Sequence, residues 1–512
     1  MSTTAISSQT PAFLYATSGE FFQAESPFPG VEIVPTPIST VADVETAVAV
    51  AHKAQITWFQ TSLNHRAAIL DRYHDLILEH QDELASIIQR ETGKARAHAV
   101  EEILQVAMIS AYYAKHAKKF LAPERRSGVL PVLTQVKVVP APKGLVGIIS
   151  PWNYPFTLSM CDILPAILAG NTVVLRPDEQ TMWSAIRGLE LLFEAGMAAD
   201  VVTMVSGSGS VIGTALTDQV DYVCFTGSTA TGRIVGAQAG ARLIGASLEL
   251  GGKNPMIVCA DSNLNKFLDI ATRACFTSAG QLCVSTERMY IHESIYEKFL
   301  AAFVIRVREL VLGAGVGWGY DVGSLVGPAQ LKRVTEAVAN AVSQGAKIEA
   351  GGNIRPEIGP YVYEPTVLSG VTGEMKISTE EVFGPCVYVQ SFKSIDEAIA
   401  LANDSSYGLS SSVITADLKL GKEIAMQLRT GSVNINEGFA SAYGSVEAPM
   451  GGMSTSGIGR RHGIEGLIRF TQPQTIATAH FATMSPKLGR SDEQWSGILV
   501  KLLQIMKILR LR

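Results

Sequence analysis

The sequence predicts an α/β protein built on a doubly wound parallel sheet, and two observations carry that prediction. From residue 144 onward, short apolar runs typical of buried parallel strands alternate with stretches of helical spacing. The expected strands cover 145–149, 172–175, 201–205 and 222–225, and the expected helices cover 156–168, a stretch ending at 193, and 211–216. A second such series begins at Pro255 and continues past Val413. Strands that alternate with helices form a sheet covered by helices on both faces.

Upstream of this region, residues 40–120 are expected to be helical. Thr40-Val41-Ala42-Asp43 resembles a capping box, and apolar residues recur at helical spacing over 41–58, 71–90 and 99–118. Residues 121–142 change character, because four prolines bracket an alternating stretch from Val132 to Val139. That stretch is expected to be a strand in a hairpin-like excursion.

Composition excludes several classes of protein. The chain has 512 residues, 47% of them apolar, which suffices for two to four domains. A net charge of −5 without a basic stripe argues against nucleic-acid binding. The six cysteines form no C-x-x-C pair and the nine histidines no H-x-x-x-H pair, so no metal site is expected. Reduced thiols fit a cytoplasmic enzyme.

The two ends of the chain raise the question of membranes. Residues 1–22 lack a basic segment followed by an apolar core, so no secretory signal is expected. Residues 495–512 are expected to form an amphipathic helix. Its apolar face would hold Ile498, Leu499, Leu502, Ile505, Met506 and Leu509, opposite Lys501, Gln504, Lys507 and Arg510. Two interpretations stay open: packing on the protein or on a second subunit, or peripheral contact with an anionic membrane.

The chemistry is indicated by a thiol and a carboxylate. Cys283 ends the segment Gly280-Gln281-Leu282-Cys283, and Glu249 lies between apolar residues in Leu248-Glu249-Leu250-Gly251-Gly252-Lys253. A thiol and a base can form and then hydrolyse a covalent thioester. Alone, each would be unremarkable, because most cysteines are inert and a glutamate on a strand is usually exposed. Two further segments complete the set: Ser150-Pro151-Trp152-Asn153-Tyr154-Pro155 and Glu381-Val382-Phe383-Gly384-Pro385.

Together these motifs resemble the aldehyde dehydrogenase superfamily, from about residue 35 to 480. The resemblance implies a Rossmann-like cofactor domain (1–118 and 141–250) and an α/β catalytic domain (251–465). It also implies a small β oligomerisation excursion (119–140 and 466–485), before the tail at 486–512. An NAD(P)-dependent aldehyde oxidation and self-association as a dimer or tetramer are expected.

The resemblance also implies the catalytic roles. Cys283 is expected to attack the aldehyde carbonyl. The side-chain amide of Asn153 and the backbone N–H of Cys283 would stabilise the resulting oxyanion. After hydride transfer, Glu249 would activate the water that hydrolyses the thioester. Its apolar neighbours, Leu248 and Leu250, should raise its pKa. His462 is expected to be structural.

For the cofactor, Phe225-Thr226-Gly227-Ser228 follows an expected strand and opens a helix, an arrangement that suits a phosphate. In the superfamily this segment lies beside the pyrophosphate, so Gly227 and Ser228 are expected contacts. Arg176-Pro177-Asp178-Glu179 matches a K-P-x-E segment that holds the adenosine ribose. Glu179 would repel a 2′-phosphate and favour NAD, whereas Arg176 would tolerate NADP, so the preference leans slightly to NAD. Alternatively, Arg176 and Glu179 form a surface ion pair.

The remaining cofactor contacts rest on the resemblance alone. Glu381 would hold the nicotinamide ribose and Phe383 would flank it. Trp152, Asn153 and Leu250 are the other expected contacts. Without the resemblance, Glu380-Glu381 would be an ordinary solvated acidic pair.

Within the superfamily the pattern is most similar to actinobacterial enzymes described as succinate-semialdehyde dehydrogenases. Better-understood members bind the distal carboxylate with arginines at the positions of Cys161 and Thr277, and neither residue carries a positive charge. Ser445 could donate a hydrogen bond instead. An uncharged aliphatic or aromatic aldehyde therefore stays an alternative substrate. Two other classes also stay open: a thiol esterase and a non-catalytic nucleotide-binding scaffold.

Overall fold

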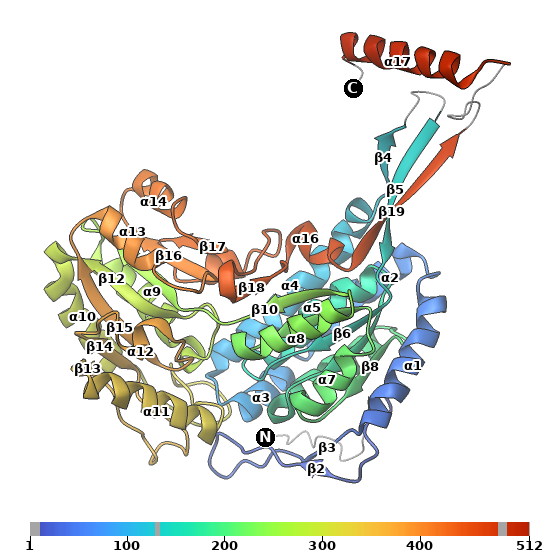
Figure 1. Ribbon diagram of the computed structural model, residues 1–512. Helices are drawn as coiled ribbons and strands as arrows, with labels where there is room; N and C mark the ends of the chain where they lie inside the picture. Colours follow the sequence, from blue (N-terminus) through green and yellow to red (C-terminus); the bar gives the residue numbers. More distant parts are fainter. Residues whose placement is uncertain (1–10, 129–133, 480–488, 511–512) are drawn as a thin grey trace. The chain divides into compact units, whose positions relative to one another are not determined.

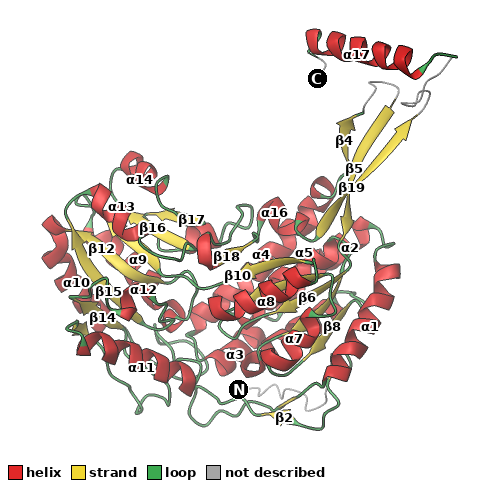
Figure 2. Ribbon diagram, in the orientation of Figure 1, coloured by secondary structure: helices red, strands yellow, loops and turns green. Residues whose placement is uncertain are grey.

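The computed structural model describes residues 11–128, 134–479 and 489–510. These fall into two compact units, the first made of residues 1–120 and 142–471 and the second of 121–141 and 472–512. Figure 1 follows the chain from its N-terminus to its C-terminus and labels most of its elements, and Figure 2 distinguishes the helices from the strands.

The first unit contains a seven-stranded sheet in the order β1-β8-β7-β6-β9-β10-β18. Its strands are β1 (Leu14–Tyr15), β8 (Val202–Val205), β7 (Thr172–Arg176), β6 (Leu145–Ile149), β9 (Tyr222–Thr226), β10 (Gly245–Glu249) and β18 (Gly457–Ile458). All neighbours are parallel except β10 and β18. The strand order reverses between β6 and β9. Open α/β sheets bind ligands at the carboxyl ends of the strands beside such a switch point.

Apolar residues on helices form a core against this sheet. Val44, Ala47, Val48 and Ala51 come from α1 (Val41–Trp58), Leu216 from α7 (Thr214–Thr217), and Val235 and Ala239 from α8 (Thr229–Ala241). They pack with strand residues that include Leu145, Val174, Val223 and Leu248. Thr40 caps α1 through a complete capping box, as the sequence predicted. The doubly wound sheet is confirmed.

A second seven-stranded sheet has the order β13-β14-β15-β12-β11-β16-β17. Its strands are β13 (Lys347–Ala350), β14 (Thr366–Ser369), β15 (Cys386–Phe392), β12 (Thr286–His292), β11 (Asn254–Val258), β16 (Ser410–Ile414) and β17 (Ser432–Ile435). Only β13 runs antiparallel to its neighbour. The surrounding helices are α9 (Leu264–Phe276), α10 (Tyr296–Arg308), α11 (Pro328–Ser343), α12 (Lys376–Thr379), α13 (Ile395–Asn403) and α14 (Leu418–Ala425).

Residues 71–90 are helical, as expected, but they belong to two helices rather than to one. They are α2 (Leu63–Glu79) and α3 (Gln81–Thr92), and His80 separates them with φ −102° and ψ 17°. The side chain of Ser62 accepts a hydrogen bond from the backbone N–H of His65 and starts α2 eight residues early. The other helices of the unit are α4 (Arg96–Phe120), α5 (Pro155–Leu168), α6 (Met182–Glu194), α15 (Ala440–Tyr443) and α16 (Gly463–Ile468). A short ribbon pairs β2 (Phe21–Phe22) with β3 (Thr36–Pro37).

The second unit contains a three-stranded sheet and the last helix. The sheet has the order β19-β5-β4, from Thr471–Ala479, Thr134–Pro142 and Glu124–Ser127. The strand expected over 132–139 is present from Thr134, and 132–133 lie outside the described residues. Helix α17 (Asp492–Ile508) buries Met506 but exposes Ile498, Ile505 and Leu509, so its apolar face is only partly covered. Across the described ranges, every helix is too short or too polar to cross a membrane.

Candidate active site

One cavity in the first unit brings the three expected catalytic residues together. Asn153, Glu249 and Cys283 all line it. The other lining residues are Tyr154, Leu158, Thr226, Leu250, Leu282, Tyr443, Met450 and Arg461. Glu249 ends β10, and Asn153 follows β6, so two of the three lie at the carboxyl edge of the first sheet. The cavity combines apolar walls with a few polar groups, as small-molecule sites do.

The turn after β6 presents Asn153 to the nucleophile segment. The Asn153 side-chain Nδ2 donates a hydrogen bond to the carbonyl of Gln281 at 3.0 Å. The backbone carbonyl of Asn153 accepts a hydrogen bond from Lys94 Nζ at 2.7 Å. Because both ends of the residue are held, the amide is fixed beside the segment that carries Cys283.

Cys283 follows a tight turn that needs unusual backbone angles. Ser278 and Ala279 have φ of 55° and 53°, and Gly280 follows with φ 69°. A Cβ on Gly280 would lie 2.0 Å from the carbonyl oxygen of Gly384, so only glycine fits there. Cys283 stays partly accessible, whereas the other five cysteines are buried. Burial, with the nearby Glu249 and Glu381, raises the pKa of the Cys283 thiol to about 12.

Glu249 is a buried carboxyl group without a hydrogen bond to one of its oxygens. Its Oε1 has no partner in the described part of the chain. Burial raises the pKa of Glu249 to about 7, the direction expected from its apolar neighbours, although nearby arginines oppose the shift. A carboxyl group with a pKa near neutrality can accept and release a proton under physiological conditions.

Sequence reasoning missed Arg461, which also lines the cavity. Its guanidinium donates to Asp162 from Nε at 3.0 Å and from Nη2 at 2.7 Å. Nη2 also donates to Thr226 Oγ1 at 2.6 Å, and Arg469 contacts the same Asp162 carboxylate. The sequence signal was the run Gly459-Arg460-Arg461-His462-Gly463, which does not show that a cation faces Glu249.

The expected phosphate segment lies at the start of α8. The side chain of Ser228 accepts a hydrogen bond from the backbone N–H of Thr231 at 3.3 Å, and Ser228 itself is exposed. The N–H of Gly227 donates to the carbonyl of Glu249 at 3.1 Å, which ties this segment to β10. Leu250 is buried and lines the cavity. A helix N-terminus beside the switch point of an α/β sheet suits a dinucleotide phosphate.

Arg176 and Glu179 do form an ion pair, at 3.5 Å. The alternative of a pair on the surface is wrong for Arg176, which is buried. Its Nε and Nη2 donate to the carbonyl of Gly207 at 2.8 and 2.6 Å, so most of the guanidinium is already committed. Glu179 stays partly exposed, and burial raises its pKa.

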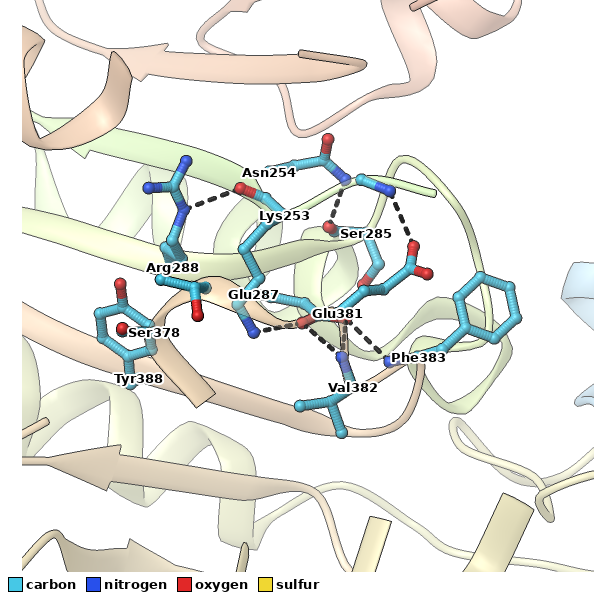
Figure 3. Close-up of polar contacts among 12 residues, drawn as sticks. Lys253, Asn254, Ser285, Glu287, Arg288, Ser378, Glu381, Val382, Phe383 and Tyr388 are labelled. Atoms are coloured by element: carbon cyan, nitrogen blue, oxygen red, sulfur yellow. Dashed lines mark hydrogen bonds and ion pairs between the residues drawn. The ribbon is translucent and has the colours of Figure 1, made fainter. Parts of the chain in front are cut away.

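Glu381 is anchored rather than solvated, so the interpretation of Glu380-Glu381 as an ordinary solvated acidic pair is wrong for Glu381, whereas Glu380 is exposed. Glu381 Oε1 accepts a hydrogen bond from the N–H of Gly252 at 2.8 Å (Figure 3). Burial and the adjacent Glu287 raise the pKa of Glu381 to about 7. The rings of Trp152 and Phe383 meet edge to face at 5.6 Å. Two expected cofactor segments are therefore in contact.

The positions that usually carry substrate arginines hold neutral, buried side chains. Cys161 and Thr277 are 5% and 2% exposed. His462 is also buried, with Nε2 at 3.0 Å from the side chain of Gln105, and burial lowers its pKa to about 4. No cluster of metal-ligating side chains occurs within the described ranges.

A doubly wound sheet carries an amide and a buried carboxylate at its carboxyl edge, and a thiol from the next sheet lines the same cavity. This arrangement is typical of a dinucleotide-dependent oxidoreductase that uses covalent catalysis. The aldehyde dehydrogenase family model matches residues 13–476. The chain belongs to the aldehyde dehydrogenase family, and it is an NAD(P)-dependent aldehyde dehydrogenase.

Named relatives and solved structures agree with this family. A Mycolicibacterium smegmatis protein provisionally named succinate-semialdehyde dehydrogenase (NADP+) is 47% identical over 94% of this chain and 93% of its own. The mitochondrial succinate-semialdehyde dehydrogenase of Oryza sativa subsp. japonica is 33% identical over 90% and 87%. A Staphylococcus aureus betaine aldehyde dehydrogenase in complex with NAD+ is 32% identical, with a TM-score of 0.88 over 93% and 94% of the two chains.

Proposed function

We propose that the protein oxidises succinate semialdehyde to succinate through a thioester on Cys283. The convergence of Asn153, Cys283 and Glu249 on one cavity carries the catalytic part of this proposal. Relatives that are 47% and 33% identical and are named succinate-semialdehyde dehydrogenases support the substrate.

In this proposal the Cys283 thiol gives its proton to solvent, its sulfur adds to the aldehyde carbon, and the carbonyl oxygen becomes an oxyanion. The Asn153 amide and the Cys283 N–H donate hydrogen bonds to it. The nicotinamide cofactor supplies the hydride acceptor. Glu249 then removes a proton from the water that attacks the thioester, with its unpartnered Oε1 as the acceptor. The C–S bond then breaks, the Cys283 thiolate takes up a proton to restore the thiol, and the carboxylic acid product is released.

The residues fit a dinucleotide, because the start of α8 and Glu381 both bond to the segment at the end of β10. The N–H of Gly227 donates to the carbonyl of Glu249, and the N–H of Gly252 donates to Glu381. We assign Gly227 and Ser228 to the pyrophosphate, Glu179 to the adenosine ribose, and Glu381 to the nicotinamide ribose. A slight preference for NAD follows, because Arg176 is committed to Gly207 and Glu179 would repel a 2′-phosphate.

We assign Arg273 as the cation that binds the carboxylate of succinate semialdehyde, at the end of the substrate away from the aldehyde. It lies one helical turn before Thr277 on α9, with its side chain 49% exposed and 2.8 Å from Glu101. Its guanidinium lies 5.9 Å from the ring of Phe439, which packs in the apolar cluster around Cys283. The second candidate, an uncharged aldehyde, is favoured by the neutral side chains of Cys161 and Thr277.

A comparison of specificity constants tests the substrate. We expect kcat/KM for succinate semialdehyde to exceed that for butanal, and Arg273→Met to remove this preference while butanal oxidation persists. The exposed Arg429→Met serves as the control. A wild-type enzyme that prefers butanal would leave the aldehyde chemistry intact but overturn the proposed substrate.

We also propose the domain division expected from the sequence, with 119–140 and 466–485 pairing between subunits. The short three-stranded sheet supports it, since such small sheets gain stability from further pairing. For α17, whose apolar face is only partly covered, we propose contact with a second subunit, with an anionic membrane as the alternative. Sedimentation analysis of the wild type tests the pairing, which a monomer would refute.

A further inference from the structure

Two lysine–glutamate pairs are buried in the first unit, and each touches a turn of the site. Lys94 Nζ lies 2.6 Å from Glu102 Oε1, and Lys253 Nζ lies 2.6 Å from Glu287 Oε2. All four side chains are at most 3% exposed. Buried ion pairs contribute little net stability, because desolvation offsets their attraction. The hydrogen bonds that the two pairs also form with backbone groups of the site therefore indicate a role other than stability.

The first pair holds the turn that carries Asn153. Lys94 donates to the Asn153 carbonyl at 2.7 Å. Glu102 Oε2 accepts hydrogen bonds from the N–H groups of Phe156 and Thr157, both at 3.1 Å. These are orphan donors at the start of α5, whose own N-cap residue forms no side-chain cap. Glu102 thus caps α5 from another helix.

The second pair holds the turn that carries Glu381 and Phe383. Glu287 accepts hydrogen bonds from the N–H of Val382 at 2.9 Å and from the N–H of Phe383 at 2.9 Å (Figure 3). Phe383 has φ 59°, a conformation that non-glycine residues adopt only when their surroundings impose it. The Lys253 carbonyl accepts a hydrogen bond from Arg288 Nε at 2.7 Å, which fixes the lysine segment as well.

We propose that the two pairs are separate positioning devices: Lys94–Glu102 sets the Asn153 turn for acyl transfer, and Lys253–Glu287 sets the Glu381–Phe383 turn for the cofactor. This inference rests on the proposed roles of Asn153, Glu381 and Phe383. Charge-assisted hydrogen bonds to backbone N–H groups are strong and directional, so each glutamate fixes its turn closely. Among the described residues, no hydrogen bond joins either pair to the turn that the other pair holds. The two turns meet through the rings of Trp152 and Phe383.

The proposal is tested by measuring both cofactor affinity and acyl transfer in each of two variants, Glu102→Gln and Glu287→Gln. Cofactor affinity is measured by calorimetric titration with NAD+ alone. Acyl transfer is measured by acylation of the enzyme with p-nitrophenyl acetate without cofactor. Glu287→Gln should weaken NAD+ binding about tenfold and change acylation less than about twofold. Glu102→Gln should slow acylation about tenfold and change NAD+ affinity less than about twofold. Glu336→Gln, in an exposed pair on α11, should change neither.

Variants that replace a whole pair guard against loss of folding. Met is close in length to both Lys and Glu. One double variant combines Lys253→Met with Glu287→Met, and the other combines Lys94→Met with Glu102→Met. Both remove the charges of a pair and keep the side-chain volume. Each double variant should show the same selective loss as its single variant. Equal losses in both assays, or no loss in a folded variant, would overturn the proposal. Wild-type acylation at a residue other than Cys283 would instead refute the proposed function.

Discussion

Arg461 and Asp162 form a bidentate ion pair at the wall of the cavity that contains Glu249. Because Arg469 contacts the same carboxylate, two guanidinium groups share one negative charge. The excess positive charge favours ionised Glu249, whereas burial disfavours it, and the pKa of about 7 reflects both influences. This cluster therefore holds the pKa of Glu249 below the value that burial alone would give.

Replacing Arg461 should shift the pH dependence of thioester hydrolysis. In Arg461→Met the pKa of Glu249 should rise, because an attractive charge is lost. Only the ionised carboxylate can accept a proton. The rise of the hydrolysis rate with pH should therefore occur at a pH about one unit higher. In Asp162→Asn the two arginines lose the negative charge that neutralises them, so the pKa of Glu249 should fall. The hydrolysis rate should then rise at a lower pH. Single-turnover deacylation measured against pH checks both, and shifts of the same sign would contradict the account.

Glu249→Gln should separate the two halves of the reaction. The thiol can still form the thioester, but its hydrolysis should slow by a factor of roughly 10² to 10⁴, because the base is lost. Intact-protein mass spectrometry during turnover should show an accumulated acyl group, and peptide mapping should place it on Cys283. Glu437→Gln provides a comparison at a glutamate outside the cavity lining. Acylation elsewhere would be incompatible with the mechanism.

Alkylation of the cofactor-free protein should report the thiol pKa of about 12. The thiolate is the reactive form, so the iodoacetamide rate should rise about tenfold per pH unit between about pH 7 and about pH 10. Cys283→Ala should lose this labelling, because the other five cysteines are buried. A rate that levels off below about pH 9 would show that the thiol ionises more easily than its burial implies.

Glu179→Gln should change the choice of cofactor. Its carboxylate would repel a 2′-phosphate, and the amide would not, so kcat/KM with NADP+ relative to NAD+ should rise about tenfold. Glu194→Gln on the exposed end of α6 is the matched control. An unchanged ratio would mean that Glu179 does not face the ribose.

Much of the first sheet and most of the candidate site could be predicted, because both depend on short local patterns. Apolar runs marked β6 and β9, and motif residues marked Cys283, Glu249 and Asn153. The break at His80 was missed because apolar spacing continues across it. Arg461 and the buried glutamates could not be recognised, because the groups that reveal their roles lie far away in the sequence. Asp162 is 299 residues from Arg461, and the N–H of Phe156 is 54 residues from Glu102.

A chain that ends at Asp492 lacks α17 and tests what covers its apolar face. If a second subunit does, truncation should lower the association state in sedimentation analysis. Partitioning onto vesicles that contain anionic lipid should stay unchanged. A loss of vesicle binding without a change in assembly would support the membrane alternative.

The cavity draws its walls from residues as far apart as Asn153 and Arg461, and β18 joins the sheet only from residue 457. During synthesis Glu249 and Cys283 leave the ribosome well before Arg461, which lines the same cavity in the finished enzyme. A nascent polypeptide therefore carries an incomplete pocket until nearly all of its translation is over, and premature stop codons upstream of position 461 should yield no partial enzyme.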